Sequence, residues 1–190
     1  MPVTLVVRIV VWTWLLAALA VGYSGALQKL PVPAIQGILF GLTIALVLAY
    51  RGIGAFRAYV DSLDIRALVA LHLTRFVGFY FLMLYRNGLL PYAFAVPGGI
   101  GDIAVAATAL IILFYPFSET TRPRATYVWN VFGLFDILLV VSSAARIGLS
   151  GSRELNALTV LPLSLLPTFL VPIIIASHLA IFSRLARERD

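Results

Sequence analysis

The stretch RALVALHLTRFVGFYFLMLY, residues 66–85, decides the fold class. It is as long as a helix that crosses the hydrocarbon core of a bilayer, and only Arg66 and Arg75 carry a charge in it. The whole chain has this character, because 62% of its residues are hydrophobic and 12% are charged, with a mean hydropathy of +1.02. Soluble domains carry about 25% charged residues. The composition therefore excludes a soluble fold and predicts an all-α integral membrane protein.

Five further stretches resemble the first in length and apolar character, so we expect six transmembrane helices. Their approximate bounds are 3–22, 35–50, 66–85, 100–117, 127–147 and 158–185. The 190 residues leave no room for a soluble second domain, which predicts a single bundle domain over residues 1–190. The first apolar run is interpreted as a retained span, with a cleaved signal peptide as the alternative.

Three segments depart from this simple pattern. Residues 89–101 contain Pro91, Pro97 and a group of glycines, which predicts an irregular segment dipping toward the bundle before the fourth span. Residues 51–64 have apolar side chains at helical spacing; they form either a short amphipathic helix in the interface or an extension of the second span. The sixth span is predicted to bend at its three prolines, Pro162, Pro167 and Pro172.

The basic residues of the predicted loops are distributed unequally between the two sides of the membrane. One side, shared by both termini, holds Arg8, Arg51, Arg57, Arg66, Arg122, Arg124, Arg184, Arg187 and Arg189, and the other holds Lys29, Arg86, Arg146 and Arg153. Cytoplasmic loops carry the excess of Lys and Arg, so both termini are expected in the cytoplasm. No basic run suggests nucleic-acid binding, and the absence of cysteine removes disulfides and thiolate metal sites.

The only two histidines of the chain, His72 and His178, both lie within predicted spans. At ~1.5 Å of rise per residue, each lies about 9 Å from the cytoplasmic end of its span. Imidazoles on facing helices are suitable axial ligands for a haem, so one hypothesis is haem b held by these histidines, with Arg75 on a propionate. Such a protein would exchange electrons with a quinone or a membrane protein partner. The alternative is that the two histidines only hydrogen-bond across helices.

Further ionisable residues within the spans extend the predicted polar site. Arg75 and Asp136 are both expected about 13–14 Å deep, where they form either a structural ion pair or part of a proton or solute pathway. Asn130 and Trp129 lie on the same span as Asp136 and are assigned to the polar site. Asp102 is expected to cap the start of the fourth span, with cation or substrate binding as the alternative. No hydrolytic or transferase motif is readable, so an enzymatic role stays open.

The runs HLTRFVGFYFLMLYRNGLLPYAFAVPGGIGD (72–102), WNVFGLFD (129–136) and LPLSLLPTFLVPIIIASH (161–178) resemble a group of small bacterial multi-span membrane proteins. The group is uncharacterised, so the resemblance implies a bacterial inner membrane but no activity. Three classes of function therefore remain open. They are a haem-linked redox protein, a transporter of protons or small solutes, and a structural or interaction subunit of a membrane complex.

Overall fold

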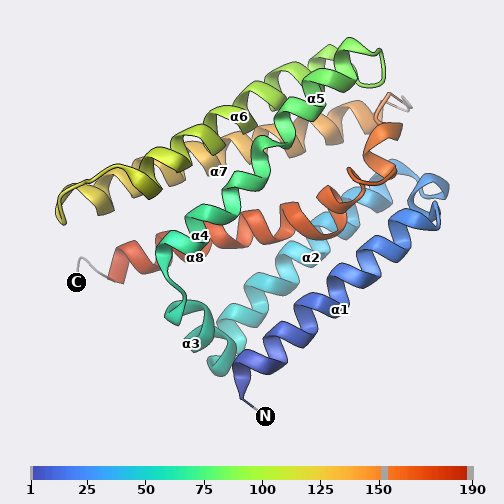
Figure 1. The fold of residues 1–190 in the computed structure, drawn as a ribbon. Helices are drawn as coiled ribbons and strands as arrows, with labels where there is room; N and C mark the ends of the chain where they lie inside the picture. Colours follow the sequence, from blue (N-terminus) through green and yellow to red (C-terminus); the bar gives the residue numbers. More distant parts are fainter. Residues whose placement is uncertain (1, 151–153, 188–190) are drawn as a thin grey trace. The chain divides into compact units, whose positions relative to one another are not determined.

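The computed structural model describes residues 2–150 and 154–187, and within these residues every regular element is helical (Figure 1). Six of the helices described are long and apolar enough to cross a membrane, as the sequence predicts. They are Val3–Tyr23, Pro33–Gly52, Ile65–Arg86, Tyr92–Phe114, Thr121–Leu149 and Leu166–Arg187. This architecture fits a polytopic membrane protein.

The chain divides into two compact units, each built from two segments. One unit contains Met1–Ser62 and Ala145–Ala176, and the other contains Leu63–Ala144 and Ser177–Asp190. Arg153 and Arg189, which the charge count includes, lie outside the described residues.

The first unit is held together by a π-helical turn. Its elements are α1 (Val3–Tyr23), η1 (Ala26–Lys29), α2 (Val32–Gly52), α3 (Gly54–Ser62), η3 (Asn156–Thr159) and the π-turn η4 (Leu166–Leu170). The η4 turn packs against both α1 and α2. Nε1 of Trp14 donates a hydrogen bond to the carbonyl of Thr168 at 2.8 Å. Since Pro172 has no N–H to donate to that carbonyl, the indole supplies the donor that the helix lacks.

Residues 51–64 form a short helix of their own. Helix α2 ends at Gly52, Ile53 has extended backbone angles, and α3 then runs over Gly54–Ser62 with no buried residue. The alternative in which the second span simply continues is therefore wrong. The placement of α3 in a membrane interface stays a prediction.

The second unit contains the third, fourth and fifth span-length helices and the end of the sixth. Its elements are α4 (Ile65–Leu71), η2 (His72–Phe76), α5 (Val77–Arg86), α6 (Tyr92–Phe114), most of α7 (Thr121–Leu149) and the last part of α8 (Val171–Arg187). The third span is not one continuous α-helix, because the 3₁₀ segment η2 separates α4 from α5. Helix α6 packs against all three of these elements, and its course beside α5 is visible in Figure 1.

Two arginines close the C-terminal end of α6. Nη2 of Arg66 donates to the carbonyl of Leu113 at 2.6 Å, and Nη1 of Arg122 donates to the carbonyl of Ile112 at 3.0 Å. The last carbonyls of a helix have no partner within it, so these guanidinium groups satisfy them and complement the helix dipole. Arg66 and Arg122, which the arginine count uses only to orient the spans in the membrane, thus also cap a helix.

The prediction of an irregular segment before the fourth span is wrong for residues 92–101. Helix α6 already begins at Tyr92 and continues through Pro97. Proline cannot donate to the carbonyl of Ala93, but the hydroxyl of Ser143 on α7 donates to that carbonyl at 3.0 Å. A neighbouring helix therefore satisfies the backbone group that the proline leaves free, and the helix does not need to break.

The sixth span-length helix begins later than the sequence analysis expects. Residues 156–159 form η3, turns follow over 161–164, and the span-length helix starts at Leu166 rather than residue 158. The π-turn η4 precedes the regular α-helix from Val171. Bending of this span at its prolines stays a prediction.

Candidate functional site

The 3₁₀ segment η2 presents two polar side chains to the interior of the second unit. His72 begins η2 and Arg75 follows three residues later; their exposed fractions are 0% and 1%. A 3₁₀-helix has about three residues per turn, so residues three apart lie one above the other along the same face. The change from α to 3₁₀ winding therefore stacks the imidazole and the guanidinium on one side of the third span.

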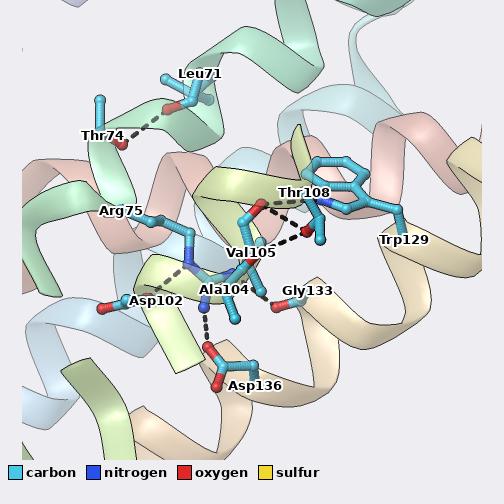
Figure 2. A network of polar contacts seen from close by, with 10 residues as sticks. All are labelled: Leu71, Thr74, Arg75, Asp102, Ala104, Val105, Thr108, Trp129, Gly133 and Asp136. Atoms are coloured by element: carbon cyan, nitrogen blue, oxygen red, sulfur yellow. Dashed lines mark hydrogen bonds and ion pairs between the residues drawn. The ribbon is translucent and has the colours of Figure 1, made fainter. Parts of the chain in front are cut away.

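Arg75 is the centre of a group that we call the ion cluster, formed with Asp102, Gly133 and Asp136 (Figure 2). Its Nε donates to Oδ1 of Asp102 at 2.7 Å, and its Nη1 donates to the carbonyl of Gly133 at 2.9 Å. Its Nη2 donates to Oδ2 of Asp136 in a second ion pair. The side chain of Asp102 is only 4% exposed, whereas that of Asp136 is 20% exposed. The carboxylate of Asp102 is thus enclosed by the protein, whereas that of Asp136 is partly accessible from outside it.

Glycines make the space that the ion cluster occupies. A Cβ atom on Gly101 would overlap the carboxylate of Asp136, and a Cβ atom on Gly78 would overlap the carbonyl oxygen of Gly99. Small residues allow helices to approach closely within a membrane. The run around Pro97, which the sequence analysis interpreted as an irregular loop, therefore contains helix-contact positions that let α5, α6 and α7 meet around Arg75.

The two histidines lie against each other in a second group, the imidazole cluster, formed by His72, His178, Trp129, Asn130 and Ser177. The ring centroids of His72 and His178 are 4.2 Å apart and their planes are tilted by 46°. The indole of Trp129 lies edge-on to His72 at 5.0 Å. A hydrogen bond of 3.0 Å joins Oγ of Ser177 to Nε2 of His72. Both histidines are fully buried.

Asn130 holds His178 through two hydrogen bonds. Its Nδ2 donates to the backbone carbonyl of His178 at 3.0 Å, and its Oδ1 lies 2.7 Å from Nδ1 of the ring. The amide nitrogen must face the carbonyl, so the amide oxygen faces the ring and accepts from an Nδ1–H. In the neutral ring, Nε2 then carries a lone pair. Among the described residues, neither that Nε2 nor Nδ1 of His72 has a hydrogen-bond partner of good geometry.

Gly133 joins the two clusters. Its carbonyl accepts from Arg75, and a Cβ atom built on it would lie 2.6 Å from Cε1 and 3.2 Å from Nε2 of His178. The same turn of α7 therefore accepts a hydrogen bond from the guanidinium of Arg75 and packs against the imidazole of His178. Figure 2 also shows Trp129 of the imidazole cluster donating to the carbonyl of Val105.

The formal charges of the ion cluster do not cancel. One guanidinium and two ionised carboxylates leave a net charge of −1 on a group that is largely buried. An uncompensated charge in a low-dielectric interior is costly. The cluster is therefore suited to binding one additional proton or monovalent cation.

The structure brings the predicted site residues together as two neighbouring clusters, although not all in the predicted roles. Asp102 does not cap α6, because that helix begins ten residues earlier and Asp102 lies in its interior beside Arg75. The roles of Ser177 and of the Gly133 carbonyl are not predicted from the sequence. Neither a hydroxyl nor a backbone oxygen leaves a distinctive signal in a sequence.

A comparison with protein families identifies one match. The model of the family described as a domain of unknown function (DUF8737) matches residues 32–186, a range that includes both clusters. No curated protein and no solved structure matches the chain.

Proposed function

The chain belongs to the DUF8737 family, and from the ion cluster we propose that it is a multi-pass membrane protein that moves protons across the membrane, alone or together with a small solute. The observation that carries the proposal is the composition of that cluster. Two carboxylates share one guanidinium, and one of them is partly open. Chains of acidic residues and histidines within membrane spans are typical of proton pathways.

A proton is the occupant that the ion cluster accommodates with least rearrangement. Arg75 already donates to both carboxylates and to the Gly133 carbonyl, so few oxygen atoms remain to surround a metal cation. Cations such as Ca²⁺ take six to eight oxygen ligands. In contrast, a single proton on Asp136 or Asp102 needs no additional ligand and makes the cluster neutral.

The proposed setting is the inner membrane of a bacterium, with both termini in the cytoplasm. The six apolar helices support a lipid bilayer environment. The orientation follows from the excess of arginine on the side of the two termini. Asp102, Asp136 and Arg75 would then lie at similar depths within their spans.

Haem ligation stays a prediction from the sequence, and the ring contact between the histidines argues against it. A haem with two axial imidazoles lies between them, and each metal–nitrogen bond is about 2 Å long. The rings of His72 and His178 are instead in direct contact, with centroids 4.2 Å apart. A Soret band in the purified protein that disappears in His72→Ala would favour the redox function, including a quinone or protein partner, over proton movement.

A purely structural role is the second alternative, because buried ion pairs can fix the contacts between helices without any other function. In that case, replacing all three charged groups together, Arg75→Leu, Asp102→Leu and Asp136→Leu, would leave every activity of a host complex intact. Proton movement predicts the opposite result, since this variant loses the group that binds the proton.

The proposal is tested with purified protein in liposomes that contain a pH-sensitive dye, with a potassium gradient and valinomycin to set the voltage. We expect wild-type protein to speed proton entry, Asp136→Asn to abolish this increase, and Glu119→Gln, which changes an exposed carboxylate, to leave it unchanged.

Infrared difference spectra detect the bound proton directly, without a transported solute. A carboxylic-acid band that disappears in Asp136→Asn or Asp102→Asn supports a bound proton. The absence of that band, together with equal flux in wild type and Asp136→Asn, would overturn the proposal.

A further inference from the structure

We propose that the imidazole cluster is the next proton-binding site of the path. Nε2 of His178 is the atom that receives the proton from the ion cluster. This inference rests on the proposed function, because it assigns the acceptor for the proton that the ion cluster binds. The step is a simple transfer. An O–H bond of a carboxylic acid breaks, an N–H bond forms at Nε2, and the carboxylate and imidazolium that result keep the total charge constant.

The first argument is the orientation of the His178 ring. The backbone carbonyl of His178 holds the amide of Asn130 in place, and Oδ1 of that amide accepts from Nδ1, so the ring cannot rotate without losing the Nδ1 contact. This fixes the proton of the neutral ring on Nδ1 and leaves the lone pair on Nε2. A buried acceptor without a partner of good geometry is costly, and a buried site that keeps one usually has a functional reason. Receiving a proton is the chemistry for which a fixed, unpartnered imidazole nitrogen is suited.

The second argument is the proximity of that nitrogen to the ion cluster. A Cβ atom on Gly133 would lie 3.2 Å from Nε2 of His178, and the carbonyl of the same glycine already accepts from Arg75. Asp136 follows Gly133 by three residues, which is close to one helical turn. One turn of α7 thus carries the carboxylate of Asp136 and also contacts the imidazole of His178 at Gly133.

The third argument is charge balance. The charged groups that surround the path are Arg75 from η2, Asp102 from α6 and Asp136 from α7. The ring of His72 faces His178 from η2, and the contribution of α8 beside it is the neutral Ser177. With the proton on His178, two positive groups face two carboxylates and the site is neutral. With the proton on a carboxylate, one positive group faces one carboxylate and the site is also neutral. The proton can therefore change place without creating an unbalanced buried charge.

His72 extends the path by one further ring. It contacts His178 with centroids 4.2 Å apart, and its Nδ1 has no hydrogen-bond partner among the residues described. The rings are too close for an ion or a porphyrin to lie between them. A proton, in contrast, needs no space between the rings. In this proposal the path leaves the ring pair at Nε2 of His72, which is hydrogen-bonded to Oγ of Ser177.

The first test uses nitrogen NMR of protein labelled with ¹⁵N-histidine, which is favourable because the chain contains two histidines. Spectra of His72→Gln assign the signals of His178. We expect the neutral ring of His178 to carry its proton on Nδ1, with a free lone pair at Nε2. A ring protonated at Nε2 and free at Nδ1 would overturn the inference, whatever the flux measurements show, and this test needs only the folded wild-type protein and one assignment variant.

The second test compares proton flux in two variants. We expect His178→Gln to lower flux by about 100-fold, the range of general acid–base effects, while the carboxylic-acid infrared band persists. Unchanged flux in His178→Gln with loss of flux in Asp136→Asn would overturn this inference and leave the proposed function standing. Unchanged flux in both variants, without a carboxylic-acid band, would overturn both. Thermal unfolding of each variant checks that it is folded.

Discussion

Asn130 and His178 contact each other twice, through the ring nitrogen Nδ1 and through the backbone carbonyl, at 2.7 and 3.0 Å. Both residues are fully buried, so neither contact can be replaced by bulk water. We expect Asn130→Leu to lower the free energy of unfolding by about 1–3 kcal/mol, because it leaves the Nδ1–H of the imidazole unsatisfied at nearly unchanged side-chain volume. The measurement is thermal or denaturant unfolding in detergent. Asn87→Leu is the matched control, since Asn87 is exposed. Equal effects of the two substitutions would contradict the argument.

Gly133 is expected to tolerate no side chain. In Gly133→Ala the new methyl group would lie 2.6 Å from Cε1 of His178 and 3.2 Å from a methyl group of Val105. Overpacking of this kind costs about 1–3 kcal/mol, which outweighs the gain of about 1 kcal/mol that alanine brings to a helix. Unfolding measurements should therefore show a net loss of stability. Gly41→Ala on α2 is the control, because a Cβ atom there meets nothing within 4 Å. That substitution should leave stability unchanged or raise it.

The ion cluster should respond differently to single and combined substitutions. Arg75→Gln alone leaves two buried carboxylates without a cation and should cost about 3–5 kcal/mol of unfolding free energy. Replacing Arg75, Asp102 and Asp136 together by leucine removes the imbalance, so the triple variant should be more stable than Arg75→Gln. It should nevertheless show no proton flux. A triple variant that is folded and still conducts protons would contradict the assignment of the cluster to proton movement.

Much of the fold can be predicted from the sequence because span length and hydropathy are local properties. Six span-length helices follow from them, and helix counting also places Arg75 near Asp136 and His72 near His178. Counting works here because a helix advances by a constant rise per residue. The 3₁₀ segment η2 rises by ~2.0 Å per residue, but over its five residues this adds only about 2–3 Å to the count.

The details that depend on contacts between helices could not be predicted in this way. Pro97 predicts a break, but the hydroxyl of Ser143 satisfies the carbonyl that proline leaves free, that of Ala93, which lies fifty positions earlier in the chain. The position of Asp102 was assigned wrongly for the same reason, since its role depends on where α6 begins. The 3₁₀ winding of η2 gives no local signal either, because no residue in HLTRF requires it; the segment packs against α6, a contact that the sequence does not reveal.

The orientation of the spans can be measured directly, because the chain contains no cysteine and single cysteines can be introduced without removing any. We expect Ser118→Cys, between α6 and α7, to be labelled by a membrane-impermeant thiol reagent only after the cells are opened. Asn87→Cys, which follows α5, should be labelled in intact spheroplasts. Both positions are exposed. The reverse pattern would place the termini outside and contradict the arginine count.

The contact between Ser143 and the carbonyl of Ala93 explains why α6 continues through Pro97, and a double-mutant cycle tests it. Ser143→Ala should lower the free energy of unfolding by about 1 kcal/mol, since it leaves that carbonyl without a donor. In a Pro97→Ala background, the backbone N–H of the new alanine supplies the donor, so the same substitution should cost much less.

Ser142→Ala is the control for this cycle, because its hydroxyl donates to Leu138 within its own helix. Its cost should be the same with proline or alanine at position 97. The coupling between positions 143 and 97 should therefore be measurable, whereas that between 142 and 97 should be close to zero. If the two couplings are equal, the hydroxyl of Ser143 does not compensate for the proline, and the continuity of α6 must have its cause in the glycine contacts with α5.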